Sequence, residues 1–199
     1  KPPFGILGSI VTAFNGFYIP SISLALGIVG LYDDKYKLPS YLRYFFQALV
    51  CIILFSFSPL SENLRDYKFI IFPLIIILST AIINFCNFID GLDGLLGSCI
   101  IISMSTLSLE QPSIFPLIAC LLAFICFNWS PAKIFMGDAG STFLGAVYVG
   151  CLMQMDSFFY FCKGLLLITP IFSDCTTCII RRFLAKQNIF KAHKLHLYQ

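Results

Sequence analysis

The sequence predicts an all-α protein whose helices form a polytopic transmembrane helix bundle. Of its 199 residues, 58% are hydrophobic and 12% are charged, whereas a soluble domain of this size carries about 25% charged residues. The mean hydropathy is +0.88, and apolar runs of helical length recur along the whole chain. The low charge content and the repeated apolar runs together predict a protein embedded in a lipid bilayer.

The apolar runs predict seven membrane-spanning helices. A helix needs about 20 apolar residues to cross the hydrocarbon core, with a lower limit near 17. The predicted spans are 17–31, 41–58, 69–86, 97–109, 114–129, 141–155 and 158–180. We interpret residues 4–16 as the remnant of an earlier helix or its connection. Several runs are short, so we expect their ends to extend into the flanking motifs or to be shielded by neighbouring helices.

Basic residues divide unequally between the two sides that these spans define. One side carries Lys35, Lys37, Arg43, Lys133, Arg181, Arg182, Lys186, Lys191 and Lys194, and the other carries Arg65, Lys68 and Lys163. The positive-inside rule makes the richer side cytoplasmic. The same side receives Asp33, Asp34, Asp90, Asp93 and Asp138. Because every second loop returns carboxylates to one face, we expect these cytoplasmic loops to be catalytic.

Composition also excludes some function classes. The net charge of +3 is too small to indicate nucleic-acid binding, and the basic residues are not interleaved with aromatics along one face. The nine cysteines lie mostly in apolar runs, where a thiol behaves as a small buried hydrophobe. The spacing of Cys175 and Cys178 is interpreted as chance.

The first polar motif, Gly30–Lys35, contains the adjacent carboxylates Asp33 and Asp34 at the end of an apolar run. Taken alone, it is explained more simply as a solvated helix end, although negative charge there opposes the helix dipole. Lys35 follows directly and partly neutralises the pair.

The second motif, Asn84–Leu95, is harder to explain as a plain loop. It places the amides Asn84 and Asn87 and the carboxylates Asp90 and Asp93 directly after an uncharged apolar run. A carboxylate at the membrane centre costs roughly 2.5–3.5 kcal/mol on insertion scales. Such groups persist where they face water, a metal or a cationic partner, and the glycine after each aspartate permits close approach to a ligand. This arrangement favours a functional site.

The third motif, Asn128–Ser141, adds a carboxylate on a flexible turn. The segment Gly137-Asp138-Ala-Gly-Ser141 surrounds the carboxylate with backbone N–H groups and a hydroxyl. Oxygen ligands of this kind suit Mg²⁺, which is held by one or two carboxylates together with water and substrate phosphates. Lys133 is within reach of a phosphate, and Phe135 is suited either to simple packing or to stacking on a flat ring.

The carboxyl-terminal stretch contains His193 and His196, which would share a face if the segment is helical. Such a pair is as often a surface feature as a ligand. Its position on the acidic side favours a phosphate-binding or proton-handling role.

In order and position, these four motifs, the first of which includes the later Gln47 beside Asp33, Asp34 and Lys35, resemble the polyprenyl-phosphate N-acetylhexosamine-1-phosphate transferases, a family that includes phospho-N-acetylmuramoyl-pentapeptide transferase. The resemblance covers residues from about 20 to 199. The carboxyl-terminal motif, His193-Lys-Leu-His196-Leu-Tyr-Gln, departs from the three consecutive histidines of the muramoyl-pentapeptide branch. It looks like the branch that initiates O-antigen or other surface glycans.

The resemblance implies roles for particular residues. Asp138 would be the principal Mg²⁺ ligand (Mn²⁺ could replace the ion), with Asn87 beside it as a metal or substrate ligand. Asp33 and Asp34 would lie by the reacting phosphates, Asp90 and Asp93 would be catalytic with Asp93 at the uridine, and Phe135 would stack on uracil. Lys35, Lys133 and Asn128 are expected to bind substrate, and His193 and His196 to contact the sugar-nucleotide phosphates.

The reaction that the resemblance implies is transfer of an N-acetyl-sugar 1-phosphate from a UDP-sugar to polyprenyl (undecaprenyl) phosphate, with release of UMP. The expected location is the bacterial inner membrane, with the active site on the cytoplasmic face and a homodimer as a possible assembly. The whole of 1–199 is expected to be one membrane domain that lacks earlier amino-terminal helices and a carboxyl-terminal end.

Two alternatives stay open on the residues alone. One is another Mg²⁺-dependent membrane phosphotransferase or prenyltransferase; however, the Ala-Arg expected after Gly94 in a CDP-alcohol phosphotransferase is replaced by Gly97-Ser98. The other is a non-enzymatic transporter, which predicts charges near the middle of helices rather than at one set of helix ends.

Overall fold

The computed structural model describes residues 18–64 and 68–169, together with the isolated positions 173, 176–177, 180–181 and 184–185. Within these residues all regular structure is helical, as the sequence predicted. The elements are α2 (Ile19–Tyr36), α3 (Ser40–Ser56), α4 (Pro59–Asn63), α5 (Lys68–Ile89), α6 (Leu95–Leu107), the 3₁₀ helix η2 (Pro112–Ile114), α7 (Phe115–Asn128), α8 (Gly137–Met153) and α9 (Phe158–Leu167).

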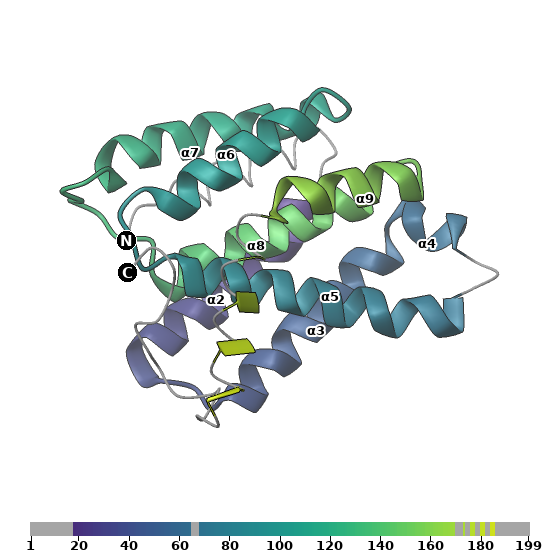
Figure 1. Cartoon of the computed structure of the whole chain (residues 1–199), viewed down its shortest axis with the longest axis horizontal. Coiled ribbons are helices and arrows are strands. Elements are labelled where there is room, and N and C mark those ends of the chain that lie inside the picture. The colour runs from purple at the N-terminus through teal and green to yellow at the C-terminus, as the bar shows by residue number, and fades with distance from the viewer. Residues whose placement is uncertain are drawn as a thin grey trace.

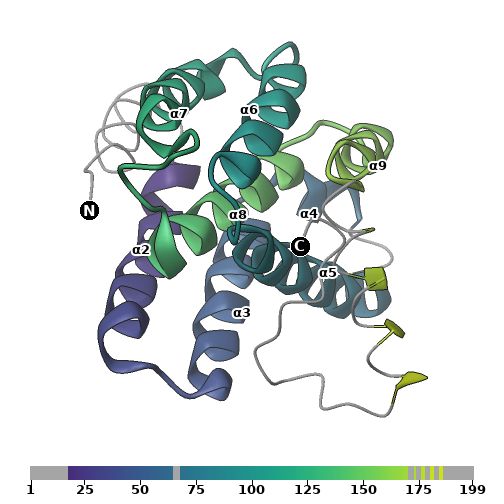
Figure 2. The same ribbon diagram turned by 60° about the vertical axis from the view of Figure 1, so that its left-hand side comes forward.

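Helix α8 runs through the middle of the bundle, with α2 and α5 packed against it (Figures 1 and 2). From Phe143 to Met153 every residue of α8 is buried. Small residues permit this close packing: a Cβ on Gly145 would lie 2.9 Å from the Cα of Ile83 on α5. Close approach at small residues is the usual way for helices to associate in apolar surroundings.

Helices α6 and α7 lie side by side above α8 in Figure 1, joined by η2. The turn after α5 and the loop after α7 are therefore both carried to the same end of the molecule. The last turn of α2 and the first turn of α8 also lie at that end (Figure 1). Three of the four polar motifs of the sequence fall at these helix ends. The fourth, the histidine motif, lies outside the described residues.

Helix boundaries differ from the predicted spans where a polar motif continues the helix. Helix α2 extends through Asp33 and Asp34 to Tyr36, and α8 begins at Gly137 rather than at residue 141. Helix α4 was not predicted; Ser58 caps it by accepting a hydrogen bond from the Ser61 N–H at 3.3 Å, and Pro59 suits its first position. The extensions show that the apolar pattern underestimates the length of helices whose ends carry polar side chains.

One helix in the described part of the chain is long and apolar enough to cross a membrane, namely the 21 residues Phe69–Ile89 of α5. Shorter apolar helices occupy Ser40–Ser56, Leu95–Leu107, Pro112–Asn128 and Phe158–Leu167. Large apolar side chains face outward on α5, where Phe69 is 97% exposed and Leu74 is 61% exposed. The all-helical fold is thus confirmed, and the number of membrane crossings stays a prediction.

Candidate active site

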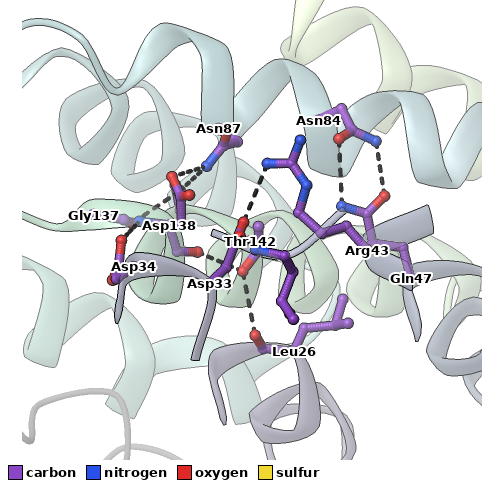
Figure 3. Close-up of polar contacts among 12 residues, drawn as sticks. Leu26, Asp33, Asp34, Arg43, Gln47, Asn84, Asn87, Gly137, Asp138 and Thr142 are labelled. Carbon is purple, nitrogen blue, oxygen red and sulfur yellow. Dashed lines mark hydrogen bonds and ion pairs between the residues drawn. The ribbon is translucent and has the colours of Figure 1, made fainter. Parts of the chain in front are cut away.

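A polar pocket lies where the end of α2, the first half of α3, the end of α5 and the start of α8 meet (Figure 3). Its polar lining consists of Asp33, Arg43, Gln47, Asn84, Asn87, Asp138 and Thr142. These side chains come from four different helices, α2, α3, α5 and α8. The pocket is therefore the place where the separate polar motifs of the sequence converge.

Asp138 and Asn87 are in direct contact at the start of α8. The Asn87 amide donates to Asp138 Oδ1 at 2.8 Å and to Ser141 Oγ at 2.9 Å. Asp138 lies in the first turn of α8, which begins at Gly137 with a φ of 66°, a conformation that favours glycine. The carbonyl oxygen of Asn87 and the carboxylate of Asp138 are both hard oxygen donors of the type that Mg²⁺ prefers.

Asp34 contacts the same helix end from α2. Its Oδ1 accepts a hydrogen bond from the Asp138 backbone N–H at 3.2 Å. A carboxylate at a helix amino terminus satisfies an otherwise unpaired N–H and interacts favourably with the helix dipole. Asp34 thereby joins the end of α2 to the start of α8, a contact between residues 104 positions apart.

Asp90 is the third carboxylate at this helix end. Burial raises its pKa from 3.8 to about 7, a backbone hydrogen bond from Gly137 opposes the shift, and the neighbouring Asp138 charge adds to it. Two carboxyl groups held close together resist full ionisation unless a cation lies near them. The described residues contain no cluster of three histidine, cysteine or acidic side chains suited to a metal, so an ion here would also need oxygens from water and substrate.

Asp33 is nearly buried and both of its carboxylate oxygens are engaged. Oδ1 accepts the Leu38 N–H at 2.6 Å, and Oδ2 pairs with the Arg43 guanidinium at 3.2 Å. Arg43 is 39% exposed and lines the pocket. Sequence reasoning had used Arg43 only to orient the chain; its position four residues before Gln47, on one face of α3, was the signal that could have placed it in the site.

Gln47 and Asn84 form a reciprocal amide pair between α3 and α5 (Figure 3). Gln47 donates to Asn84 Oδ1 at 3.3 Å, and Asn84 donates to Gln47 Oε1 at 2.8 Å. The second N–H of Asn84 donates to the Thr80 carbonyl at 2.7 Å. Gln47 is 3% exposed and Asn84 is half-buried, so this pair is largely shielded from solvent.

A second group of predicted residues joins the α5–α6 and α7–α8 loops. Asp93 Oδ2 accepts the Ala132 N–H at 3.0 Å. The side-chain oxygen of Asn128 (Oδ1) accepts the Gly94 N–H at 3.0 Å, and its side-chain amide nitrogen donates to the Ile134 carbonyl at 2.9 Å. Asn128 was expected to bind substrate, but it is 4% exposed and both ends of its side chain bond to the main chain. In this structure it holds two loops together.

Of the remaining predicted residues, Phe135, Lys133 and Lys35 are described by the structure and do not belong to the pocket lining. Phe135 is 67% exposed on the loop that Asn128 holds, and Lys133 is exposed on the same loop. The Lys35 ammonium lies 5.0 Å from the centroid of the Tyr36 ring, on the surface of α2. His193 and His196 lie outside the described residues.

The structure is a helical bundle with an oxygen-rich pocket whose lining includes one arginine, Arg43. The sequence profile of glycosyl transferase family 4 matches residues 17–156, and the chain belongs to this family.

The chain is 34% identical over 193 residues to the probable undecaprenyl-phosphate N-acetylglucosaminyl 1-phosphate transferase of Bacillus subtilis, covering 86% of this chain and 54% of the relative. It is 29% identical over 178 residues to the phospho-N-acetylmuramoyl-pentapeptide-transferase of Dictyoglomus thermophilum (78% and 58%). It is 31% identical over 166 residues to the undecaprenyl-phosphate alpha-N-acetylglucosaminyl 1-phosphate transferase of Escherichia coli K12 (69% and 45%). The chain thus spans about half the length of these relatives.

Proposed function

We propose that the full-length protein transfers an N-acetyl-sugar 1-phosphate from a UDP-sugar to polyprenyl phosphate and releases UMP. The observation that carries this proposal is the contact between Asn87 and Asp138 at 2.8 Å in a pocket that Arg43 also lines. A cation-binding pair and a guanidinium in one pocket suit a reaction between two phosphate groups. The family membership and the names of the relatives support the same reaction.

The chemistry requires two anions to meet. An oxygen of the lipid phosphate attacks the sugar-bearing phosphorus of the UDP-sugar, the bond from that phosphorus to the bridging oxygen breaks, and UMP leaves with the bond electrons. The second pKa of a phosphate monoester is about 6, so the attacking phosphate is largely dianionic at neutral pH. Catalysis then rests mainly on positioning and on compensation of negative charge.

The site residues divide this work. Mg²⁺, when bound, would compensate charge on the diphosphate, and Asp138 and Asn87 are proposed to hold it, with Asp34 and Asp90 close to the same helix end. Arg43 is proposed to bind the lipid phosphate. Its partner Asp33 orients the guanidinium: because both Asp33 oxygens are engaged, we assign it this role rather than that of a nucleophile. Phe135 and Lys133, exposed on the neighbouring loop, are proposed to bind the nucleotide.

We also propose that the protein is a multi-pass inner-membrane protein with this pocket at the cytoplasmic face. The 21-residue apolar stretch of α5 is long enough to cross the hydrocarbon core. Lys35 and Lys37 lie at the end of α2, Arg43 lies in the first turn of α3 and Lys133 lies on the loop between α7 and α8, whereas Lys163 lies on α9. This distribution favours the orientation that the positive-inside rule gives.

The test is an assay of the full-length protein in detergent, with polyprenyl phosphate and a panel of UDP-N-acetyl sugars. We expect UMP release that requires Mg²⁺ and the lipid, with one sugar preferred. UMP release that proceeds without the lipid phosphate, or none with any donor from folded protein, would contradict the proposed reaction.

A further inference from the structure

The amide pair of Gln47 and Asn84 places two polar side chains between α3 and α5, which also meet through apolar contacts such as that of Phe55 with Phe72. Burying amide groups costs free energy unless each is hydrogen-bonded, and here the two bonds of 3.3 and 2.8 Å satisfy one donor and one acceptor on each side chain. An apolar pair would fill the same space without that requirement. The pair is therefore better explained by the geometry that it imposes than by stability alone.

The two bonds fix how α3 and α5 lie relative to each other. Apolar side chains tolerate sliding and rotation, whereas a reciprocal amide pair has one arrangement in which both bonds form. Asn84 is itself held by its bond to the Thr80 carbonyl at 2.7 Å. The pair therefore holds α3 and α5 in one relative position where Gln47 and Asn84 meet.

This position lies directly behind the two working parts of the pocket. Helix α3 begins near the pocket and α5 ends near it, so Arg43, one turn before Gln47, and Asn87, one turn after Asn84, both lie on the pocket side of the pair (Figure 3). Arg43 reaches Asp33, and Asn87 reaches Asp138. The amide pair thus directly connects the two helices that carry Arg43 and Asn87, α3 and α5.

We propose that Gln47 and Asn84 are positioning residues that set the separation between the Arg43 guanidinium and the Asn87–Asp138 pair. The inference rests on the proposed function, in which Arg43 and the cation site bind phosphate groups that must approach each other. A misplacement of about 1 Å costs such a reaction up to about 100-fold. Neither amide needs to touch the substrate for this role.

The test uses three variants of the full-length protein in detergent. Gln47→Met keeps the length of the side chain but removes both hydrogen bonds. The double variant Gln47→Asn with Asn84→Gln exchanges the two amides and keeps the summed length. Asn63→Ala is the matched control, because Asn63 donates a hydrogen bond at 2.7 Å to the Asp156 carbonyl at the other end of the bundle.

The first measurement is the affinity for polyprenyl phosphate in Mg²⁺, read from the rise in melting temperature without any UDP-sugar. We expect Gln47→Met to weaken this affinity about tenfold, the exchanged pair to recover to within about threefold, and Asn63→Ala to lower the melting temperature without changing the affinity. Unchanged affinity in Gln47→Met, or an exchanged pair as weak as Gln47→Met, would overturn the proposal.

The second measurement separates positioning from general destabilisation. We expect Gln47→Met to raise KM for polyprenyl phosphate while KM for the UDP-sugar changes less than about twofold, because the nucleotide is assigned to the Phe135 loop, which is not part of the pocket lining. Equal losses for both substrates would indicate a purely structural role. If no donor releases UMP, the proposed reaction fails, and the binding measurement still decides the role of the amide pair; if the lipid does not stabilise the wild-type protein, both fail.

Discussion

The Asn87 amide donates a hydrogen bond to Asp138 Oδ1 at 2.8 Å, across 51 residues of sequence. The contact joins the end of α5 to the first turn of α8, the helix that runs through the bundle. It leaves the amide carbonyl and the second carboxylate oxygen as candidate ligands for a cation. The proposed mechanism depends on this pair more than on any other contact.

Replacing Asn87 should weaken the cation site without unfolding the protein. In Asn87→Ala the Asp138 carboxylate loses its orienting partner, and loss of such a partner typically weakens metal binding by about 10–100-fold. The Mg²⁺ concentration for half-maximal UMP release should rise by that factor. Asn63→Ala removes an amide contact at the far end of the bundle and should leave the Mg²⁺ dependence unchanged. An unchanged Mg²⁺ requirement in Asn87→Ala would exclude Asn87 from the cation site.

Removing the Arg43 guanidinium should affect the lipid substrate most. Arg43→Met should raise KM for polyprenyl phosphate by at least about tenfold, equivalent to about 1.4 kcal/mol, because the pocket loses its positive charge. Arg43→Lys should give a KM for polyprenyl phosphate between those of the wild type and Arg43→Met, since an ammonium keeps the charge but loses the planar fork of donors. The matched control is Lys163→Met on α9, where the lysine lies 5.7 Å from the centroid of the Tyr160 ring. A larger effect on the UDP-sugar than on the lipid would reassign Arg43 to the donor.

The raised pKa of Asp90 predicts a pH dependence of stability in the absence of divalent ions. Its pKa of about 7 in the fold lies above the ordinary 3.8, so between these values the folded protein binds the proton more tightly than the unfolded chain. The Asp90 carboxyl therefore destabilises the fold progressively as pH rises from about 4 to 7. In chelator, Asp90→Asn should raise the melting temperature at pH 8 and much less at pH 5. An equal effect on the melting temperature at both pH values would show that burial does not raise the pKa of Asp90.

Two glycines on α2 give a matched test of the α2–α8 contact. A Cβ on Gly30 would lie 2.5 Å from the Cα of Ala139, whereas a Cβ on Gly27 would make its nearest contact at 3.6 Å, with Phe143. Gly30→Ala should destabilise the fold by about 1–3 kcal/mol and reduce activity, because it pushes α2 away from the first turn of α8. Gly27→Ala should be neutral or stabilising, since alanine favours a helix. Thermal unfolding of both variants checks this, and equal melting temperatures would contradict the close packing at Gly30.

The sequence predicted the helical fold and the region of the site because both leave local signals. The apolar run before Asn84 located α5 to within a few residues, and the aspartates that follow marked the helix end where the pocket lies. The seventh predicted span, 158–180, begins with α9, but α9 ends at Leu167, and most of the rest of that span lies outside the described residues. Residues such as Asp33, Asn87 and Asp138 could be singled out because polar groups beside apolar helices need an explanation.

Side-chain partners could not be predicted in the same way. Arg43 has its partner Asp33 ten residues away across a turn, and Gln47 has Asn84 on another helix, 37 residues away; hydropathy carries no information on either pairing. Asn128 is a further example: its motif suggested substrate binding, and the sequence carried no sign that both ends of its amide bond to the main chain. Roles that depend on which atom an amide faces require the three-dimensional structure.

The most direct test of the account is the Mg²⁺-dependent release of UMP by the full-length protein in its wild-type form and as Asp138→Asn. We predict that Asp138→Asn lowers the rate by more than about 100-fold at all Mg²⁺ concentrations, because the pocket loses the carboxylate that Asn87 orients. The control Asp156→Asn removes an exposed carboxylate between α8 and α9 and should keep the wild-type rate. UMP release that is independent of Mg²⁺ and survives in Asp138→Asn would contradict the assignment of this site.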